Sequence, residues 1–372
     1  CSVVSRRLGE KREDEAFKAA ETGYAILLIC TVAFMLIGVF FSKPFFKIYT
    51  NDPELIQMGT SYLRICLIVS LGCFLGVFNE KILQATGDTI HPMIIQLCGA
   101  IFNIVFDPIL IFGYFGFPAM GIEGAAYATV AGQFVSMFVG IFYAKRNQYV
   151  NIKFLRFSID RKAAKDILQV GLPSVVMQGI GTIMTSLMNA ILITYEIVAT
   201  TVFGVYFKLQ SFVFMPVFGL NSGLMPILAY NYGAKNRERM MKALRLGMIV
   251  AFAIMVLGML AFMLIPDSLL GLFEASPRML EVGEVALRRI ALSFPLAAFT
   301  IILGALFQAM GDGYISMITS LTRQIGILIP SAWLLGKLFG LDAIWFSFII
   351  AEVVVIVLSV MFFGKEKKKL EF

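Results

Sequence analysis

Charged side chains are scarce in this sequence. Asp, Glu, Lys and Arg make up 15% of the 372 residues, whereas soluble globular proteins contain about 25%. Hydrophobic residues reach 59%, compared with roughly 45 to 50% in soluble proteins. This composition excludes an ordinary soluble domain and indicates a chain that lies in a lipid bilayer.

Residues that bind metals and nucleotides are also scarce. The sequence has one histidine and five cysteines, and the cysteines lack the spacing of metal ligands or of a disulfide framework. It contains no Gly-x-x-x-x-Gly-Lys-[Ser/Thr] segment, so it carries no recognisable ATP-binding loop. We therefore expect a protein without a cofactor, and a transporter rather than an enzyme.

Long apolar stretches, separated by short polar breaks, fill most of the chain. A transmembrane helix needs about 20 predominantly apolar residues. Ten stretches meet this requirement, so we predict an all-α integral membrane protein with ten transmembrane helices. The stretches are 21–41, 55–85, 92–113, 118–144, 164–194, 197–230, 243–265, 279–310, 314–336 and 341–363.

The sequence repeats itself at an offset of 224 positions. The matching pairs are Gly9 and Gly233, Pro53 and Pro277, Gly59 and Gly283, Leu63-Arg64 and Leu287-Arg288, and the turns 84–88 and 308–312. Further on the offset falls to 219, which pairs 121–123 with 340–342. Internal repeats in a membrane protein are typical of secondary transporters. Because each unit holds an even number of helices, we predict a parallel pseudo-symmetric repeat.

The repeat also predicts how the chain is divided. We expect an N-lobe at 1–146, a cytoplasmic linker at 147–163, a C-lobe at 164–363 and a basic cytoplasmic tail at 364–372. The second unit opens near Ala163, so a complete first unit would need about 60 further residues before residue 1. We therefore expect an intact protein of twelve helices, of which this chain lacks the first two.

Positive charge gathers on one predicted side of the membrane. Lys and Arg cluster at 1–18, 145–165, 235–245 and 365–369. Basic loops stay in the cytoplasm, so we expect both ends of the intact protein on the cytoplasmic side. The net charge of +7 thus reflects topology, and we expect the lipid bilayer, but no nucleic acid, as a partner.

Asp107 is an acidic side chain within an apolar stretch, where ionisable groups are costly enough to indicate function. Asn103 precedes it by four positions, which places the amide and the carboxyl on one helix face. Pro108 cannot donate to the carbonyl of Ile104, which leaves that oxygen available. Thr129 on the next helix is expected at a similar depth. We predict an oxygen-rich site for H+ or Na+; alternatively, Asp107 only fixes helix packing.

Other polar residues in the C-lobe are weaker candidates for a substrate cavity. Glu352 lies within the last span and can pair with Arg323 or Lys208, in a structural or a functional role. Lys208 can face a cavity or form an ion pair inside the lobe. Gln178 and Asn189 can contact substrate or form hydrogen bonds between helices.

Several segments together resemble the multidrug and toxic compound extrusion (MATE) family, in its prokaryotic DinF-like branch. They are Ser5-Arg-Arg-Leu-Gly9, Leu83-Gln-Ala-Thr-Gly-Asp88, Asn103-x-x-x-Asp107-Pro108, Gly121-Ile-Glu-Gly-Ala-Ala-Tyr-Ala-Thr129, Pro216-Val-Phe-Gly-Leu-x-x-Gly-Leu-x-Pro226 and Tyr230-Asn-Tyr-Gly-Ala234. The resemblance implies two six-helix bundles around a central cavity, in a monomer of the bacterial plasma membrane.

The same resemblance implies a cation-coupling site in the N-lobe. Its residues fall on Asn103, Asp107 and Thr129, which would hold H+ or Na+, and on Asn79 at the end of the fourth helix. The family's first-helix aspartate has no counterpart in this chain. Another branch uses acidic residues in the C-lobe, but this seventh helix offers Gln178 and Asn189 instead, which favours coupling through the N-lobe.

The function that this resemblance implies is secondary-active efflux. Family members export amphipathic, mostly cationic small molecules by antiport with H+ or Na+, through alternating access. An alternative is a flippase of lipid-linked anionic precursors, with Lys208, Arg323, Arg288 and Arg289 forming a basic cavity. A passive channel is disfavoured by the duplication and by an acid on one lobe only.

Overall fold

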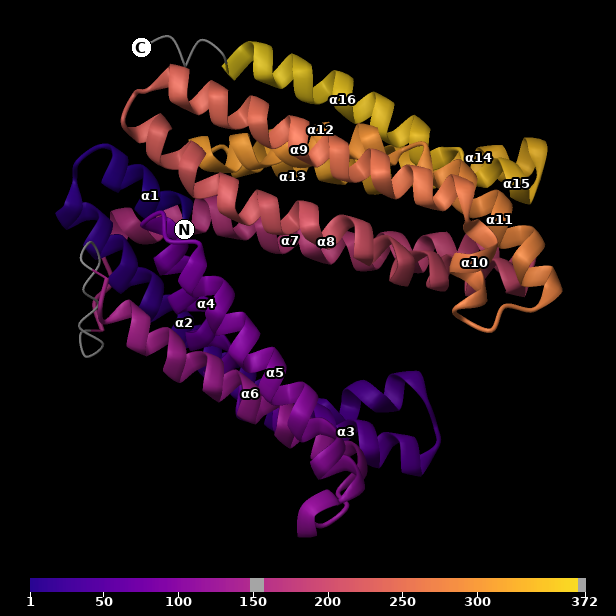
Figure 1. Ribbon diagram of the computed structural model, residues 1–372, viewed down its shortest axis with the longest axis horizontal. Helices are drawn as coiled ribbons and strands as arrows, with labels where there is room; N and C mark the ends of the chain where they lie inside the picture. Colours follow the sequence, from indigo (N-terminus) through magenta and orange to yellow (C-terminus); the bar gives the residue numbers. More distant parts are fainter. Residues whose placement is uncertain (148–156, 367–372) are drawn as a thin grey trace. The chain divides into compact units, whose positions relative to one another are not determined.

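A computed structural model describes residues 1–147 and 157–366 (Figure 1). All regular elements within these ranges are helices. The chain divides into two compact units at residues 165 and 166. Residues 148–156 of the predicted linker and 367–372 of the predicted tail lie outside the described residues.

The first unit is built around a pair of neighbouring helices, α5 and α6, which run side by side (Figure 1). Small residues allow this close approach, because a Cβ atom added at Gly124 would lie 2.4 Å from the carbonyl oxygen of Leu110. The helices of this unit are α1 (Ser2–Gly9), α2 (Glu13–Tyr49), α3 (Pro53–Ile68), α4 (Leu71–Ala85), α5 (Ile90–Phe112), the 3-10 helix η1 (Tyr114–Gly116) and α6 (Gly121–Ala144).

The second unit has a larger apolar core, which includes the fully buried rings of Phe203, Tyr206, Phe294 and Trp345. Its helices are α7 (Arg161–Leu192), which begins just before the division, α8 (Ile197–Gly233), α9 (Arg237–Leu264), α10 (Pro266–Gly271), α11 (Pro277–Ala291), α12 (Phe294–Met310), α13 (Gly313–Leu321), the π-helix η2 (Thr322–Leu328), α14 (Ile329–Phe339), α15 (Leu341–Ile344) and α16 (Ser347–Glu366).

The helices fit the apolar stretches of the sequence. The described residues contain seven helices long and apolar enough to cross a membrane, or nine if each of two bent pairs is one span. The bent pairs are α3 with α4 and α11 with α12, each with an angle of 48°. The predicted span 314–336 falls on α13, η2 and α14, which follow one another without a break in helical backbone. The all-helical membrane fold is confirmed.

The sequence repeat is also a repeat of backbone conformation. Gly87 and Gly311, 224 positions apart, both have positive φ angles, of 88° and 95°. Lys11 and Lys235 share the same offset and have φ angles of 59° and 55°. An L-residue with a side chain rarely adopts this conformation, so its recurrence supports two units of one fold.

Candidate functional site

The first unit brings three of the predicted cation-site residues together. Asn103 and Asp107 lie one turn apart on α5, and Thr129 lies on α6. The Nδ2 atom of Asn103 is 3.4 Å from Oδ1 of Asp107 and 3.4 Å from Oγ1 of Thr129. Because α5 and α6 are adjacent, the amide of Asn103 bridges the two helices at the level of the carboxyl.

In one orientation, the amide of Asn103 forms shorter hydrogen bonds with both Asp107 and Thr129. In it, Nδ2 donates to Oδ2 of Asp107 at 2.8 Å, and the amide oxygen accepts from the backbone N–H of Thr129 at 3.3 Å. Such assignments follow from the hydrogen-bond network. In both orientations the amide donates to Asp107, so the carboxyl is held as an acceptor.

Two of these residues lie at a cavity of about 330 Å³ within the first unit, whose described lining does not include Asp107. Asn103 and Thr129 line it, together with Glu80 of α4. Glu80 is 5% exposed, and its Oε2 atom accepts from Nε2 of Gln96 at 2.9 Å. The other lining residues are Gly72, Cys73, Gly76, Val77, Gln96, Gly99, Ala100, Gly132, Gln133 and Ser136.

Oxygen atoms dominate the chemistry of this site. Carboxylate, amide and hydroxyl oxygens are the ligands that hard cations prefer, and a carboxylate is also the usual proton carrier within membranes. The residues that can hold H+ or Na+ are Asp107, Asn103 and Thr129. The described residues contain no group of three or more His, Cys, Asp or Glu able to hold a metal ion.

Asn79 lies apart from this cluster. It is fully buried on α4, and Cβ of Asn79 would lie 3.0 Å from a Cβ atom added at Gly140 of α6. Neither amide atom of Asn79 has a hydrogen-bond partner among the described residues. Its side chain does not line the cavity among the described residues, so its predicted part in cation coupling has no direct geometric support.

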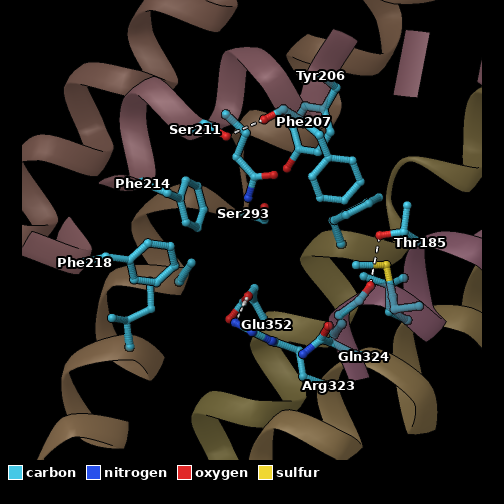
Figure 2. A pocket seen from close by; sticks show the side chains of 18 of the residues that line it. Thr185, Tyr206, Phe207, Ser211, Phe214, Phe218, Ser293, Arg323, Gln324 and Glu352 are labelled. Carbon is cyan, nitrogen blue, oxygen red and sulfur yellow. Dashed lines mark hydrogen bonds and ion pairs between the residues drawn. The ribbon is translucent and has the colours of Figure 1, made fainter. Parts of the chain in front are cut away.

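The second unit contains a larger cavity, of about 510 Å³ (Figure 2). Helix α8 contributes an aromatic wall, which consists of Tyr206, Phe207, Phe214 and Phe218. Helix α8 also contributes Gln210, Ser211 and Met215. The remaining lining comes from other helices of the unit, namely Gln178, Gly181, Thr182, Met184, Thr185, Ser293, Ala297, Ile301, Arg323, Gln324, Leu328, Phe348, Ala351 and Glu352.

An ion pair forms the polar side of this cavity. Nη1 of Arg323 lies 3.1 Å from Oε1 of Glu352, and Oγ1 of Thr300 donates to Oε2 of Glu352 at 3.0 Å. Of the two open possibilities for Glu352, the structure thus shows Arg323 and not Lys208 as its partner. The two charges lie below the rings of Phe207 and Phe214 in Figure 2.

The other predicted cavity residues divide into two groups. Gln178 and Glu352 line the larger cavity, whereas Asn189 and Lys208 are absent from its described lining. Lys208 is exposed, and its Nζ atom lies 5.6 Å from the centre of the Phe273 ring. Asn189 has a buried Oδ1 atom without a hydrogen-bond partner.

The four basic residues expected to form the cavity of a lipid-precursor flippase do not line one cavity in the described structure. Arg323 lines the cavity, but Arg288 pairs with Glu284 at 2.7 Å on the surface. Arg289 donates to the carbonyl oxygen of Asp342. Only one of the four proposed basic residues therefore belongs to the described lining.

Sequence analysis missed two features of these cavities. Glu80 is an acid within the apolar stretch 55–85, and the cost of burying a charge could have identified it. The aromatic wall of α8 could not have been found in this way, because the chain has 35 phenylalanines and their sequence positions do not tell which of them line a cavity.

A family model described as MatE matches residues 1–109 and 173–334, which is most of the chain. The chain belongs to the MatE family. The matched segments include Asn103 and Asp107 in the first unit and Arg323 in the second. The family that the sequence motifs indicated is thereby confirmed, and so is the prediction of a secondary transporter rather than an enzyme.

Relatives and solved structures agree with this membership. The chain is 24% identical over 354 residues to the multidrug export protein MepA of Staphylococcus haemolyticus (strain JCSC1435), covering 95% of this chain and 77% of that protein. It is 26% identical over 353 residues to MepA of Staphylococcus aureus (strain N315), covering 94% and 77%.

The fold matches that of solved transporters. One is a MOP superfamily transporter from Pyrococcus furiosus Vc1 (DSM3638), described as having a binding pocket of reverse polarity, with a TM-score of 0.92 and 25% identity over 100% of this chain and 83% of that one. Another is the outward-facing conformation of a multidrug resistance MATE family transporter, with a TM-score of 0.91, 25% identity and the same coverage.

Proposed function

We propose that this protein exports amphipathic small molecules, organic cations among them, in exchange for H+ or Na+. Three observations support the proposal: membership of the MatE family, relatives named for multidrug export, and a cavity with an aromatic wall in the second unit. We further propose that it works as a monomer in a bacterial plasma membrane, with the ends of the intact protein in the cytoplasm.

The coupling proposal rests on the amide of Asn103, which contacts Asp107 on α5 and Thr129 on α6. A cation that binds the carboxylate of Asp107 competes for the oxygen atoms that now accept from Asn103. The amide then loses an acceptor on α5 while it still contacts Thr129 on α6. Cation binding thus changes the hydrogen bonds of the amide through which α5 contacts α6.

Coupling requires that the cation bind two conformations of the protein unequally, because a ligand with equal affinity for both shifts nothing. We propose that the two units move relative to each other in an alternating-access cycle. In this cycle the cation and the exported molecule stabilise different conformations. Pro108, one residue after Asp107 within α5, interrupts the helix hydrogen bonds there and lets the site and the helix shape change together.

The test is a flux measurement in proteoliposomes that contain the protein. An organic cation such as an ethidium-like dye is added, and the movement of H+ and of Na+ is recorded separately. The proposal predicts dye-dependent flux of one of these ions and dye uptake driven by its gradient. Dye movement that does not depend on either the H+ or the Na+ gradient would contradict antiport, and so would cation flux that does not depend on the dye.

A further inference from the structure

We infer that the 510 Å³ cavity of the second unit binds aromatic molecules that carry an anionic oxygen group, such as a carboxylate or sulfonate, and that Arg323 is the residue that recognises this group. The inference deepens the proposed export function and rests on it. It widens the expected substrates from cations to aromatic anions and zwitterions.

The size and shape of the cavity suit a small aromatic molecule. Ligand cavities in proteins typically have volumes of about 300 to 1,000 Å³, and this one has about 510 Å³. The rings of Phe207, Phe214 and Phe218 line it, with Phe214 and Phe218 side by side and Phe207 across from them in Figure 2. Aromatic rings favour offset or edge contacts with another ring, so an aromatic ligand has several surfaces to pack on.

The more exposed of the two charged groups that line this cavity is the guanidinium of Arg323. Arg323 and Glu352 are the two charged side chains of the described lining. The Arg323 side chain is 27% exposed, compared with 10% for Glu352. Both side chains line the cavity, and Arg323 is the more exposed of the two.

Hydrogen-bond capacity leads to the same conclusion. A guanidinium carries five N–H donors, and in the described structure Arg323 donates from Nη1 to one acceptor, Oε1 of Glu352. Both oxygens of Glu352, in contrast, already accept a hydrogen bond, from Arg323 and from Thr300. An anionic ligand can use the remaining donors without breaking the pair, whereas a cation at Glu352 would have to share carboxylate oxygens that already accept from Arg323 and Thr300.

The backbone around Arg323 is adapted to present polar groups. Residues Thr322–Leu328 form a π-helix, which is rare and often found at functional sites. Two consecutive residues of it, Arg323 and Gln324, both line the cavity. Arg323 also borders a second cavity of about 140 Å³, where Asn221 has a buried Oδ1 atom without a partner.

The experiment measures equilibrium binding of tritium-labelled naphthoate to the purified protein, with naphthylmethylammonium as the matched cationic probe. We expect saturable naphthoate binding that weakens by roughly tenfold or more in Arg323→Gln, since a hydrogen bond to a charged group contributes about 1.5 to 3 kcal/mol. Arg288→Gln is the control, because Arg288 lies outside the cavity and pairs with Glu284. Binding should be unchanged in this control.

Thermal unfolding checks that each variant is folded. The variant Arg323→Lys keeps the charge and should retain part of the affinity. Naphthoate binding that is equally strong in Arg323→Gln would overturn the inference. So would saturable naphthylmethylammonium binding that is lost in Glu352→Gln and kept in Arg323→Gln, because the acid would then be the recognition group.

Failure of this inference can be told apart from failure of the proposed function. Binding is measured without any ion gradient. Naphthoate binding through Arg323 without dye-dependent cation flux would leave the site intact and contradict the antiporter. Dye-dependent flux without naphthoate binding would contradict the site alone.

Discussion

The two units of this chain use equivalent positions for different chemistry. At an offset of 224, Gly99 of α5 corresponds to Arg323 of the π-helix, and at an offset of 219, Gln133 of α6 corresponds to Glu352 of α16. All four residues line a cavity of their own unit. The repeated backbone thus places a cavity at the equivalent point of each unit. The residues at these two positions are neutral in the first unit and charged in the second.

Further along α5 and the helical segment that corresponds to it, the charged side chain belongs to the first unit instead of the second. Asn103 and Asp107 of the first unit correspond to Ile327 and Ser331 of the second. The hydroxyl of Ser331 donates to the carbonyl oxygen of Ile327, within its own helix. The two units therefore share a scaffold and differ at a few partly buried positions.

The largest effect is expected when the first unit loses its acid. Asp107→Asn should weaken cation binding by roughly thirtyfold, because removing one partner from a hydrogen-bonded charge site costs about 2 kcal/mol or more. Radioactive sodium binding and proton release on dye addition measure this. Ser331→Ala at the equivalent position should leave both unchanged, and equal losses in the two variants would remove the functional difference between the units.

A smaller effect is expected at Glu80, the second acid near the first cavity. Glu80→Gln keeps the size of the side chain but removes a negative charge from the surroundings of Asn103 and Thr129. Because charges interact strongly in a medium of low dielectric, cation affinity should fall by roughly fivefold to tenfold. The same binding measurement applies, with the exposed Glu284→Gln as control; unchanged affinity in Glu80→Gln would assign this acid a purely structural role.

Packing provides a third comparison. A Cβ atom at Gly99 would lie 2.1 Å from Oγ of Ser136 and 3.1 Å from the carbonyl oxygen of Gly132. Gly99→Ala should therefore destabilise the first unit by about 1 to 3 kcal/mol through overpacking. Gly179 of α7 has open space around it, so Gly179→Ala should be neutral or slightly stabilising. Thermal unfolding of both variants tests this, and a similar melting temperature would disprove the close packing of α5 against α6.

The smallest effect concerns the start of α11. Arg278 donates from Nε and Nη2 to both carboxylate oxygens of Glu196, at 2.9 Å each, and these hydrogen bonds hold the pKa of Glu196 below its usual range. The equivalent residue of the first unit is Glu54, which has the opposite charge.

A lowered pKa in the folded state means that the pair stabilises the protein above the carboxyl's unfolded pKa, and that this contribution is lost as the pH falls through the folded value. Glu196→Gln should thus lower the melting temperature slightly at neutral pH and leave it unchanged at strongly acidic pH. The pair is exposed to solvent, so the shift should shrink with added salt. A difference that grows on acidification would contradict this assignment.

Sequence alone predicted the fold well, because apolar runs of spanning length and a residue-by-residue repeat both follow directly from the bilayer and from duplication. The cluster of Asn103, Asp107 and Thr129 was also predictable, since four-residue spacing fixes a helix face and the neighbouring helix is next in sequence. Such local patterns determine which side chains share a level.

The rest depended on contacts between distant helices. The pairing of Arg323 with Glu352 could be named but not chosen over Lys208, because no local spacing relates residues on separate helices. Asn79 was placed at the cation site by resemblance and is absent from the described lining of the cavity that Asn103 and Thr129 line. Neither the π-helix at Arg323 nor the aromatic wall of α8 leaves a mark in the sequence pattern.

The most direct test of a division of labour between the two units is naphthoate binding measured side by side in Asp107→Asn and Arg323→Gln. We predict that Asp107→Asn binds naphthoate as the unmodified protein does, while Arg323→Gln binds it roughly tenfold more weakly or worse. The reverse pattern, with naphthoate binding lost in Asp107→Asn and unchanged in Arg323→Gln, would contradict separate cation and ligand sites.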